Sequence, residues 1–198
     1  MTPEAPVVFL CGPRAGGNSD TAGLAVAEGL AQAGRPARVI ALRGHPVAPC
    51  RGCGACAAPA RRCPLDRPGD DAEALFAAIM AAPVVAFAAP IYFYHVPALF
   101  KALIDRAQRH YEARLAGDPS HAALAARRAR VVLVAGRKQG ERLFEGALLS
   151  LKYFLWPFHV SLAEPRLLRG LDAPGDLAGD APALAGLVAY GRDAARGE

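Results

Sequence analysis

Four cysteines lie close together in the segment 50–63, CRGCGACAAPARRC, which is followed at once by a proline. Cys50, Cys53, Cys56 and Cys63 follow the pattern C-x2-C-x2-C-x6-C, so successive thiolates can turn toward one centre. This geometry suits an iron–sulfur cluster or a tetrahedral zinc ion. The pattern is close to the ferredoxin run C-x2-C-x2-C-x3-C-P, but the longer last gap would let the fourth thiolate close the same cluster. The segment therefore predicts ligation.

Disulfide bonds are a competing interpretation of these four cysteines. Adjacent C-x-x-C pairs in an intracellular chain more often bind metal or do redox work than staple a fold. We therefore favour a cluster, with zinc or free thiols as the alternatives. The fifth cysteine, Cys11, stands at the end of an apolar run and is expected to be a small buried residue.

A glycine-rich loop over 12–19, GPRAGGNS, is the second segment whose residues could do chemistry. Its glycines let a ligand come close to the backbone, and the following helix offers its first N–H groups. Together with the Ser19 hydroxyl and the Arg14 cation, these groups suit a phosphate. It lacks both the P-loop Gly-Lys-Ser/Thr and G-x-G-x-x-G. The alternative is an ordinary turn with Asn18 or Ser19 as the N-cap of the following helix.

Two further loops carry candidate binding residues. The loop over 90–97, PIYFYHVP, places three aromatic residues where a buried strand should have ended. Tyr92 to Tyr94 could flank a planar ring, or they could cover the hydrophobic core. The loop over 135–141, AGRKQGE, has glycines and two cations, which would attract an anion weakly or simply be solvated.

Alternating strands and helices position these loops. Strands are expected at 7–10, 37–42, 83–89, 131–134 and within 160–168. Helices are expected at 18–33, from the Asp70-Asp71 cap to residue 80, and at 97–115, 141–156 and 182–195. Strands that are apolar throughout and alternate with helices predict a parallel sheet covered on both faces. In such a sheet a ligand lies beyond the carboxyl ends of the strands, which here means the loops after residues 10, 89 and 134.

Length and composition allow one ordinary domain over 1–198, with a long cysteine-bearing loop at about 45–69. Hydrophobic residues make up 53% of the chain and charged residues 21%, which excludes a disordered chain. The net charge of +5 comes from scattered residues and does not indicate a nucleic-acid surface. No signal peptide and no membrane-spanning run is recognisable. We therefore expect a cytoplasmic protein that binds neither nucleic acid nor membrane.

Three motifs in order resemble one known family. CGPRAGGNS, the cysteine loop followed by Asp70-Asp71, and APIYFYHVPALFKALIDR are similar to the flavodoxin-like NAD(P)H-dependent FMN reductases, specifically their iron–sulfur flavoprotein branch. The resemblance covers nearly the whole chain. It implies a flavodoxin-like three-layer α/β sandwich with a five-stranded parallel sheet in the order 2-1-3-4-5.

The resemblance also implies roles for individual residues. Phosphate contacts would come from Gly12, Pro13, Arg14, Asn18 and Ser19; ring contacts from Pro90, Ile91, Tyr92 and Phe93; and the third flavin loop would begin at Gly136. Cys50, Cys53, Cys56 and Cys63 would hold a 4Fe-4S cluster. Two features depart from the family pattern. Cys11-Gly12 replaces the usual Gly-Ser, which removes one phosphate hydroxyl, and the gap before Cys63 is one residue longer.

The functional hypothesis is an FMN-dependent oxidoreductase that moves electrons between a 4Fe-4S cluster and FMN, without a required acid–base side chain. Its expected partners are NAD(P)H or a one-electron protein donor such as a ferredoxin, and it is expected to form a homodimer or homotetramer. One alternative is an NAD(P)H-dependent FMN or quinone reductase without a cluster. Another is a non-enzymatic electron carrier, or a binding module stiffened by zinc.

Overall fold

The computed structural model describes residues 4–197, so the domain predicted for 1–198 includes four end residues outside the described part. Its centre is a parallel sheet in the order β2-β1-β3-β4-β5, with β6 also paired to β4. The strands are β1 Val7–Leu10, β2 Arg38–Ala41, β3 Val85–Pro90, β4 Arg127–Ala135, β5 Val160–Leu162 and β6 Arg166–Arg169. The predicted flavodoxin-like architecture and strand order are confirmed.

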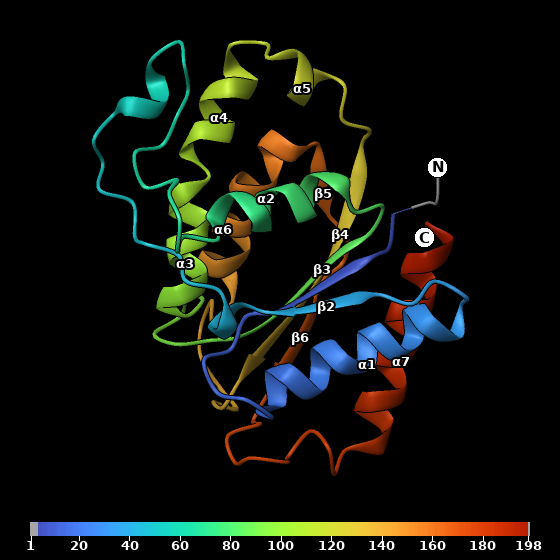
Figure 1. Ribbon diagram of the computed structural model, residues 1–198. Helices are drawn as coiled ribbons and strands as arrows, with labels where there is room; N and C mark the ends of the chain where they lie inside the picture. The colour runs from blue at the N-terminus through green and yellow to red at the C-terminus, as the bar shows by residue number, and fades with distance from the viewer. Residues whose placement is uncertain (1–3, 198) are drawn as a thin grey trace.

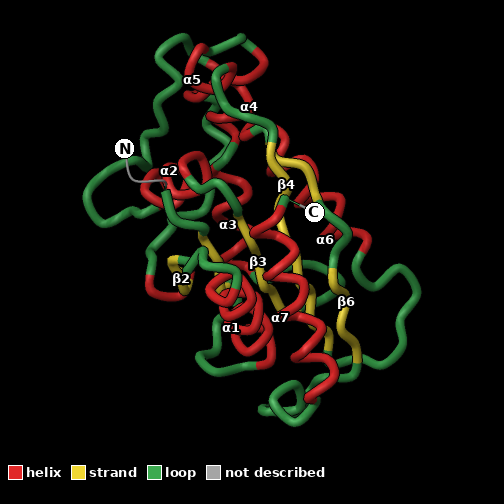
Figure 2. Tube along the Cα trace, turned by 90° about the vertical axis from the view of Figure 1, so that its right-hand side faces the viewer, coloured by secondary structure: helices red, strands yellow, loops and turns green. Residues whose placement is uncertain are grey.

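Helices cover both faces of this sheet (Figure 1). One face carries α1 (Asn18–Gln32) and α7 (Ala181–Arg196), which lie in front of the strands in Figure 2. The other carries α2 (Ala72–Ala81), α3 (Ala98–Arg106) and α6 (Glu145–Leu155). The remaining helical segments are α4 Gln108–Leu115, α5 Pro119–Ala122, η1 Leu42–Gly44, η2 Ala55–Ala57 and η3 Trp156–Phe158. Each face of the sheet has its own core, as expected for strands apolar on both sides.

The fifth position in the sheet differs from the prediction of five strands. Two short strands, β5 and β6, share it: β5 pairs with the start of β4, and β6 pairs with its end. The residues between them include Pro165, which has no backbone N–H to donate to a neighbouring strand. The single strand predicted within 160–168 is therefore divided.

The predicted helix over 97–115 is divided as well. It breaks at Ala107, whose N–H bonds to the Ile104 carbonyl three residues back, and α4 then begins at Gln108. The helix predicted from residue 141 begins only at Glu145, because Gly140 and Arg142 before it have positive φ values of 156° and 53°. The short helix α5 was not predicted.

Helices α1 and α7 pack unusually closely through glycine. A Cβ added at Gly29 would lie 2.0 Å from the Val188 carbonyl oxygen, and one at Gly191 would lie 2.1 Å from that of Val26. Only glycine permits this approach, so these two residues set the spacing of the helix pair. None of the helices within residues 4–197 combines the length and apolar character needed to cross a membrane.

Candidate functional site

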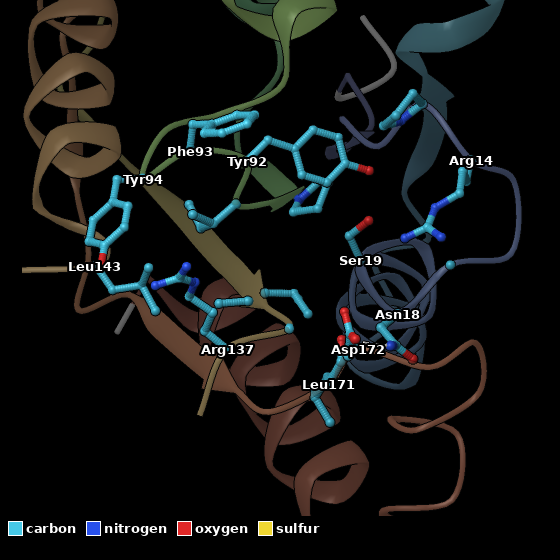
Figure 3. A pocket seen from close by; sticks show the side chains of 17 residues that line it. Arg14, Asn18, Ser19, Tyr92, Phe93, Tyr94, Arg137, Leu143, Leu171 and Asp172 are labelled. Atoms are coloured by element: carbon cyan, nitrogen blue, oxygen red, sulfur yellow. Dashed lines mark hydrogen bonds between the residues drawn. The ribbon is translucent and has the colours of Figure 1, made fainter. Parts of the chain in front are cut away.

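A cavity of about 360 Å³ opens at the carboxyl ends of β1, β3 and β4 (Figure 3). Its walls come from the loops after these strands and from the loop between β6 and α7. Nine of the ten residues predicted to bind the flavin line it: Pro13, Arg14, Asn18, Ser19, Pro90, Ile91, Tyr92, Phe93 and Gly136. The tenth, Gly12, is not among the lining residues but lies directly behind Ser19. The predicted loops therefore do meet at one place.

One end of the cavity is suited to an anion. Gly17, Asn18 and Ser19 stand at the N-terminus of α1, where the first backbone N–H groups have no partner within the helix. The Arg14 guanidinium extends into the cavity toward Ser19 (Figure 3). These groups form the anion end of the cavity, where a phosphate would meet backbone donors, a hydroxyl and a cation together.

Asn18 contributes to this end through its backbone. Its side-chain amide donates to the carbonyls of Leu171 (3.1 Å) and Ala173 (2.9 Å), while its Oδ1 accepts from the Leu177 N–H at 3.1 Å. The side chain therefore ties the first loop to the β6–α7 loop. The N-cap of α1 is Gly17, which makes no side-chain hydrogen bond. The alternative in which Asn18 or Ser19 is the N-cap is therefore wrong.

Gly12 has no space for a side chain in this loop. A Cβ at this position would lie 2.7 Å from the Ser19 Oγ, so the Ser19 hydroxyl already fills the place that a residue-12 side chain would need. The loop is closed from behind by Asp20, which accepts from the Gly16 N–H at 3.0 Å and pairs with Arg43 at 3.0 Å. Cys11 is fully buried, as predicted, and this burial together with Asp20 raises the pKa of its thiol.

The opposite end of the cavity is aromatic. Tyr92, Phe93 and Tyr94 are 38%, 102% and 40% exposed, so they do not cover the core, and that alternative is wrong. Phe93 and Tyr94 both have positive φ, 49° and 64°, in a turn closed by the Tyr92 N–H and the His95 carbonyl at 2.8 Å. The His95 Nε2 lies 2.8 Å from the Ser150 Oγ, which attaches the turn to α6.

Sequence reasoning did not assign several lining residues to the site. They are Gly17, Val134, Ala135, Arg137, Leu143, Leu171 and Asp172; Tyr94 also lines the cavity and was named only among the aromatic residues that could flank a planar ring. Arg137 carries a sequence signal, since it is one of two cations at the end of a strand. Asp172 carries none, because only the fold brings the β6–α7 loop here; a Cβ at Gly136 would lie 2.4 Å from its Oδ1.

The cavity fits FMN in size and in chemistry. Its volume lies within the range of about 300–1,000 Å³ usual for small-molecule sites. The anion end suits the phosphate, and the aromatic end suits the ring. Glycine at residues 12 and 136 lets the side chains of Ser19 and Asp172 pack directly against the backbone of these loops.

A second hollow of about 360 Å³ lies where the cysteine loop faces α3 and α4, and it shares no lining residue with the first. Cys50, Cys53, Cys56 and Cys63 all line it, and all four are free thiols. We call it the cysteine hollow. Figure 1 shows the loop projecting beside α4, away from the ends of the strands that line the flavin cavity. The thiols and the flavin loops are therefore separate parts of the molecule.

A buried ion pair fixes the base of the cysteine loop. Arg106 on α3 donates from Nη1 to the Asp70 Oδ2 at 2.8 Å and to the Ala48 carbonyl at 3.1 Å. Burial alone would raise the pKa of the Asp70 carboxyl, but the hydrogen bonds from Arg106, Ala48 and Ala72 hold it below its ordinary value. The two ends of the loop are thereby held to the same helix.

The cysteine hollow offers four sulfur donors, the number that a 4Fe-4S cluster uses, but their spacing does not suit a single metal ion. Burial, and the neighbouring Glu112 and thiols, raise the pKa of Cys56. Within residues 4–197 no three Cys, His, Asp or Glu side chains stand close enough to share one metal ion. Thiolates around one zinc ion are only about 3.8 Å apart, given Zn–S bonds of about 2.3 Å, whereas the four irons of a cluster spread them farther.

Comparison with known proteins identifies a family. The protein-family model described as "NADPH-dependent FMN reductase" matches residues 6–157, about three quarters of the chain. No curated protein sequence matches the chain.

Solved structures resemble the fold at low sequence identity. A flavone reductase has a TM-score of 0.71 at 12% identity; the alignment covers 96% of this chain and 62% of that one, so this chain spans less than two thirds of its length. An NAD(P)H:quinone oxidoreductase from Methanothermobacter marburgensis has a TM-score of 0.67 at 21% identity, with coverages of 96% and 94%. A flavodoxin from the domain Archaea has a TM-score of 0.55 at 14% identity, and the alignment covers 97% of this chain and 96% of that one.

Proposed function

The chain belongs to the NADPH-dependent FMN reductase family, whose members are oxidoreductases that use FMN, and we propose that it couples FMN to a 4Fe-4S cluster held by its four-cysteine loop. The observation that carries this proposal is the gathering of all four thiols in the cysteine hollow, apart from a cavity that fits FMN. FMN supplies hydride and single-electron chemistry, and a cluster supplies single-electron transfer.

The residues of the flavin cavity bind and orient in this proposal. Arg14, Ser19 and the backbone N–H groups at the start of α1 hold the phosphate. Tyr92 and Phe93 would lie beside the ring, and the Arg137 guanidinium, which lies 6.0 Å from the centre of the Tyr94 ring, adds a cation near these aromatic residues. No side chain has to transfer a proton for this chemistry, because the cofactors carry out the electron transfer.

In the cysteine hollow, Cys50, Cys53, Cys56 and Cys63 provide the four thiolates that a 4Fe-4S cluster needs. The backbone also contributes, since the Gly52 N–H already donates to the Cys50 Sγ at 3.5 Å. Hydrogen bonds to sulfur are one of the factors that set the potential of such clusters.

A cluster-free reductase is the second candidate. One observation favours it, the likeness in fold to a protein titled NAD(P)H:quinone oxidoreductase. In this case NAD(P)H reduces the flavin directly. NAD(P)H is the electron donor we propose in either case, with a ferredoxin-like protein as the alternative in the first.

We also infer self-association, because the cysteine loop projects from the body of the domain and electron transfer requires a flavin within range. A symmetric dimer, or a dimer of dimers, is the simplest arrangement. Light scattering of the protein with both cofactors bound, at micromolar concentration, should give a mass at least twice that of the chain. A monomeric mass would remove this inference.

Anaerobic purification, with iron, acid-labile sulfide and flavin measured together, tests the proposed function. We expect one FMN and about four irons and four sulfides per chain. One FMN with no iron or sulfide would leave the cluster-free reductase, and zinc without flavin would leave the binding module. Protein containing neither flavin nor metal after reconstitution would contradict all of these functions.

A further inference from the structure

Arg106 is a buried cation at the cysteine hollow with hydrogen-bonding capacity to spare. It lines the hollow with the four thiols, yet only 2% of the residue is exposed. Its Nη1 is engaged by Asp70 and Ala48. Its Nε and Nη2 have no partner among the described residues. A buried N–H group without a partner costs roughly 1–3 kcal/mol, so two such groups on one side chain call for an explanation.

The guanidinium is held firmly where it is. Asp70 Oδ2 accepts from both Arg106 and the Ala48 N–H at 2.8 Å, and Asp70 Oδ1 accepts from the Ala72 N–H at 3.2 Å. Because one face of the guanidinium fork is fixed in this way, the other face cannot turn to water without breaking a buried ion pair. Cys63 lies close enough to act on Arg106 electrostatically.

The other charged residues of the hollow are less available. Arg109 is paired with Glu73, and Asp105 is paired with Lys101 at 2.6 Å, where both side chains are more than 40% exposed. Arg51 and Glu112 also line the hollow, and Arg51 is exposed to solvent. Arg106 is thus the buried cation whose unused donors belong to the same hollow as the thiols.

We propose that Arg106 is a positioning residue for the cluster, which donates from Nε and Nη2 to the Cys63 sulfur or to an adjacent cluster sulfide. This inference rests on the proposed function. A cluster gains one negative charge when it accepts an electron, and a fixed cation with hydrogen bonds to sulfur stabilises that reduced form more than the oxidised one. Arg106 therefore raises the reduction potential of the cluster.

Redox titration of the holoprotein, monitored by the electron paramagnetic resonance signal of the dithionite-reduced cluster, tests this role. The variants are Arg106→Lys, which keeps the charge and the Asp70 pair but loses the fork, and Arg106→Gln, which loses both. Arg114→Gln is the matched control, because it removes a cation from α4 that does not line the hollow and instead lies over the Trp156 ring. Iron and flavin contents are measured on every sample.

We expect Arg106→Lys to favour the oxidised cluster about tenfold more than the parent, which for one electron is a fall of about 59 mV. The change should be larger in Arg106→Gln and absent in Arg114→Gln. Should Arg106→Gln fail to fold, Arg106→Lys still decides the matter. Unchanged potential and signal in a fully loaded Arg106→Lys protein would overturn this inference alone. If the parent itself takes up no iron, the cluster proposal fails, and this inference fails with it.

Discussion

Arg14 is a side-chain cation reaching into the anion end of the flavin cavity, so its effect should depend on the ligand's phosphate. We expect Arg14→Gln to weaken FMN binding roughly tenfold or more, since a charge-assisted hydrogen bond contributes roughly 1.5–3 kcal/mol. Riboflavin, which lacks the phosphate, should bind weakly and equally to both proteins. Fluorescence titration of the apoprotein measures both ligands.

The control for this change is Arg35→Gln, which removes an arginine beyond the other end of α1, where its Nη1 contacts the Ala195 carbonyl. It should leave FMN affinity unchanged. If Arg14→Gln weakens riboflavin and FMN to the same extent, the phosphate does not bind at this end.

His110 predicts a pH dependence of stability. Burial, Arg109 and His121 lower its pKa to about 3, well below the ordinary value of 6.5. Its Nδ1 lies 2.9 Å from the His121 Nε2, and its Nε2 lies 4.0 Å from the Glu73 carboxylate. Between pH 6.5 and 3 the unfolded chain binds a proton at this position that the folded chain does not. The free energy of unfolding therefore falls as the pH falls, by up to about 1.4 kcal/mol per pH unit.

His110→Gln should remove this part of the pH dependence. Between pH 7 and pH 5, urea unfolding should show the parent losing roughly 2 kcal/mol more than the variant. Some dependence should remain, because burial lowers the pKa of His121 as well. Equal losses in the two proteins would mean that His110 is protonated in the folded state at pH 5.

The sequence indicates which residues are candidates for the site more readily than it indicates what they contact. The sequence picked out Arg14 and Ser19 because loops rich in glycine before helices bind phosphate. It could not indicate that the Asn18 side chain is engaged by Leu171 and Ala173, since those partners lie more than 150 residues away. Nor could it distinguish Arg106 from the other arginines, because its importance comes from burial.

At the scale of elements, the close contact between α1 and α7 gives a matched pair of predictions. Gly191→Ala places a methyl group 2.1 Å from a backbone oxygen of α1, which forces the helices apart. Overpacking of this kind costs about 1–3 kcal/mol. Gly186→Ala, in the same helix but with open space around its Cβ position, should instead stabilise by up to about 1 kcal/mol.

Urea unfolding of the two variants measures both effects. The two substitutions are chemically identical and differ only in what the added carbon meets. We therefore expect the free energy of unfolding to fall in Gly191→Ala and to rise in Gly186→Ala. Stabilisation by both would show that the helices can separate without cost.

Helices and strands were predicted well where a local sequence pattern determines their bounds, and poorly where contacts with distant parts of the chain determine them. The apolar run of β1 matches its prediction residue for residue. The division of the last strand into β5 and β6 depends on pairing with two different ends of β4, which no local pattern contains. The interruption between α3 and α4 has no proline or glycine to announce it.

On the scale of the whole molecule, the fold keeps the two candidate sites apart. The flavin cavity is built from the loops after β1, β3, β4 and β6, whereas the cysteine hollow is built from the excursion after β2 together with α3 and α4. This separation was predictable from the strand order, because the flavin loops were expected after β1, β3 and β4, whereas the cysteines follow β2 at the edge of the sheet. The meeting of the cysteine loop with α4 was not, since it depends on side-chain packing.

The most direct test of this two-site account is the FMN and iron content of Cys63→Ser, measured beside the parent after identical anaerobic reconstitution. A serine hydroxyl is a much poorer ligand for iron than a thiolate, so the variant should lose or degrade its cluster. The account predicts that iron and sulfide fall well below the parent values while FMN remains near one per chain. Full iron and sulfide in the variant would contradict the ligand assignment, and a folded variant without FMN would contradict the independence of the two sites.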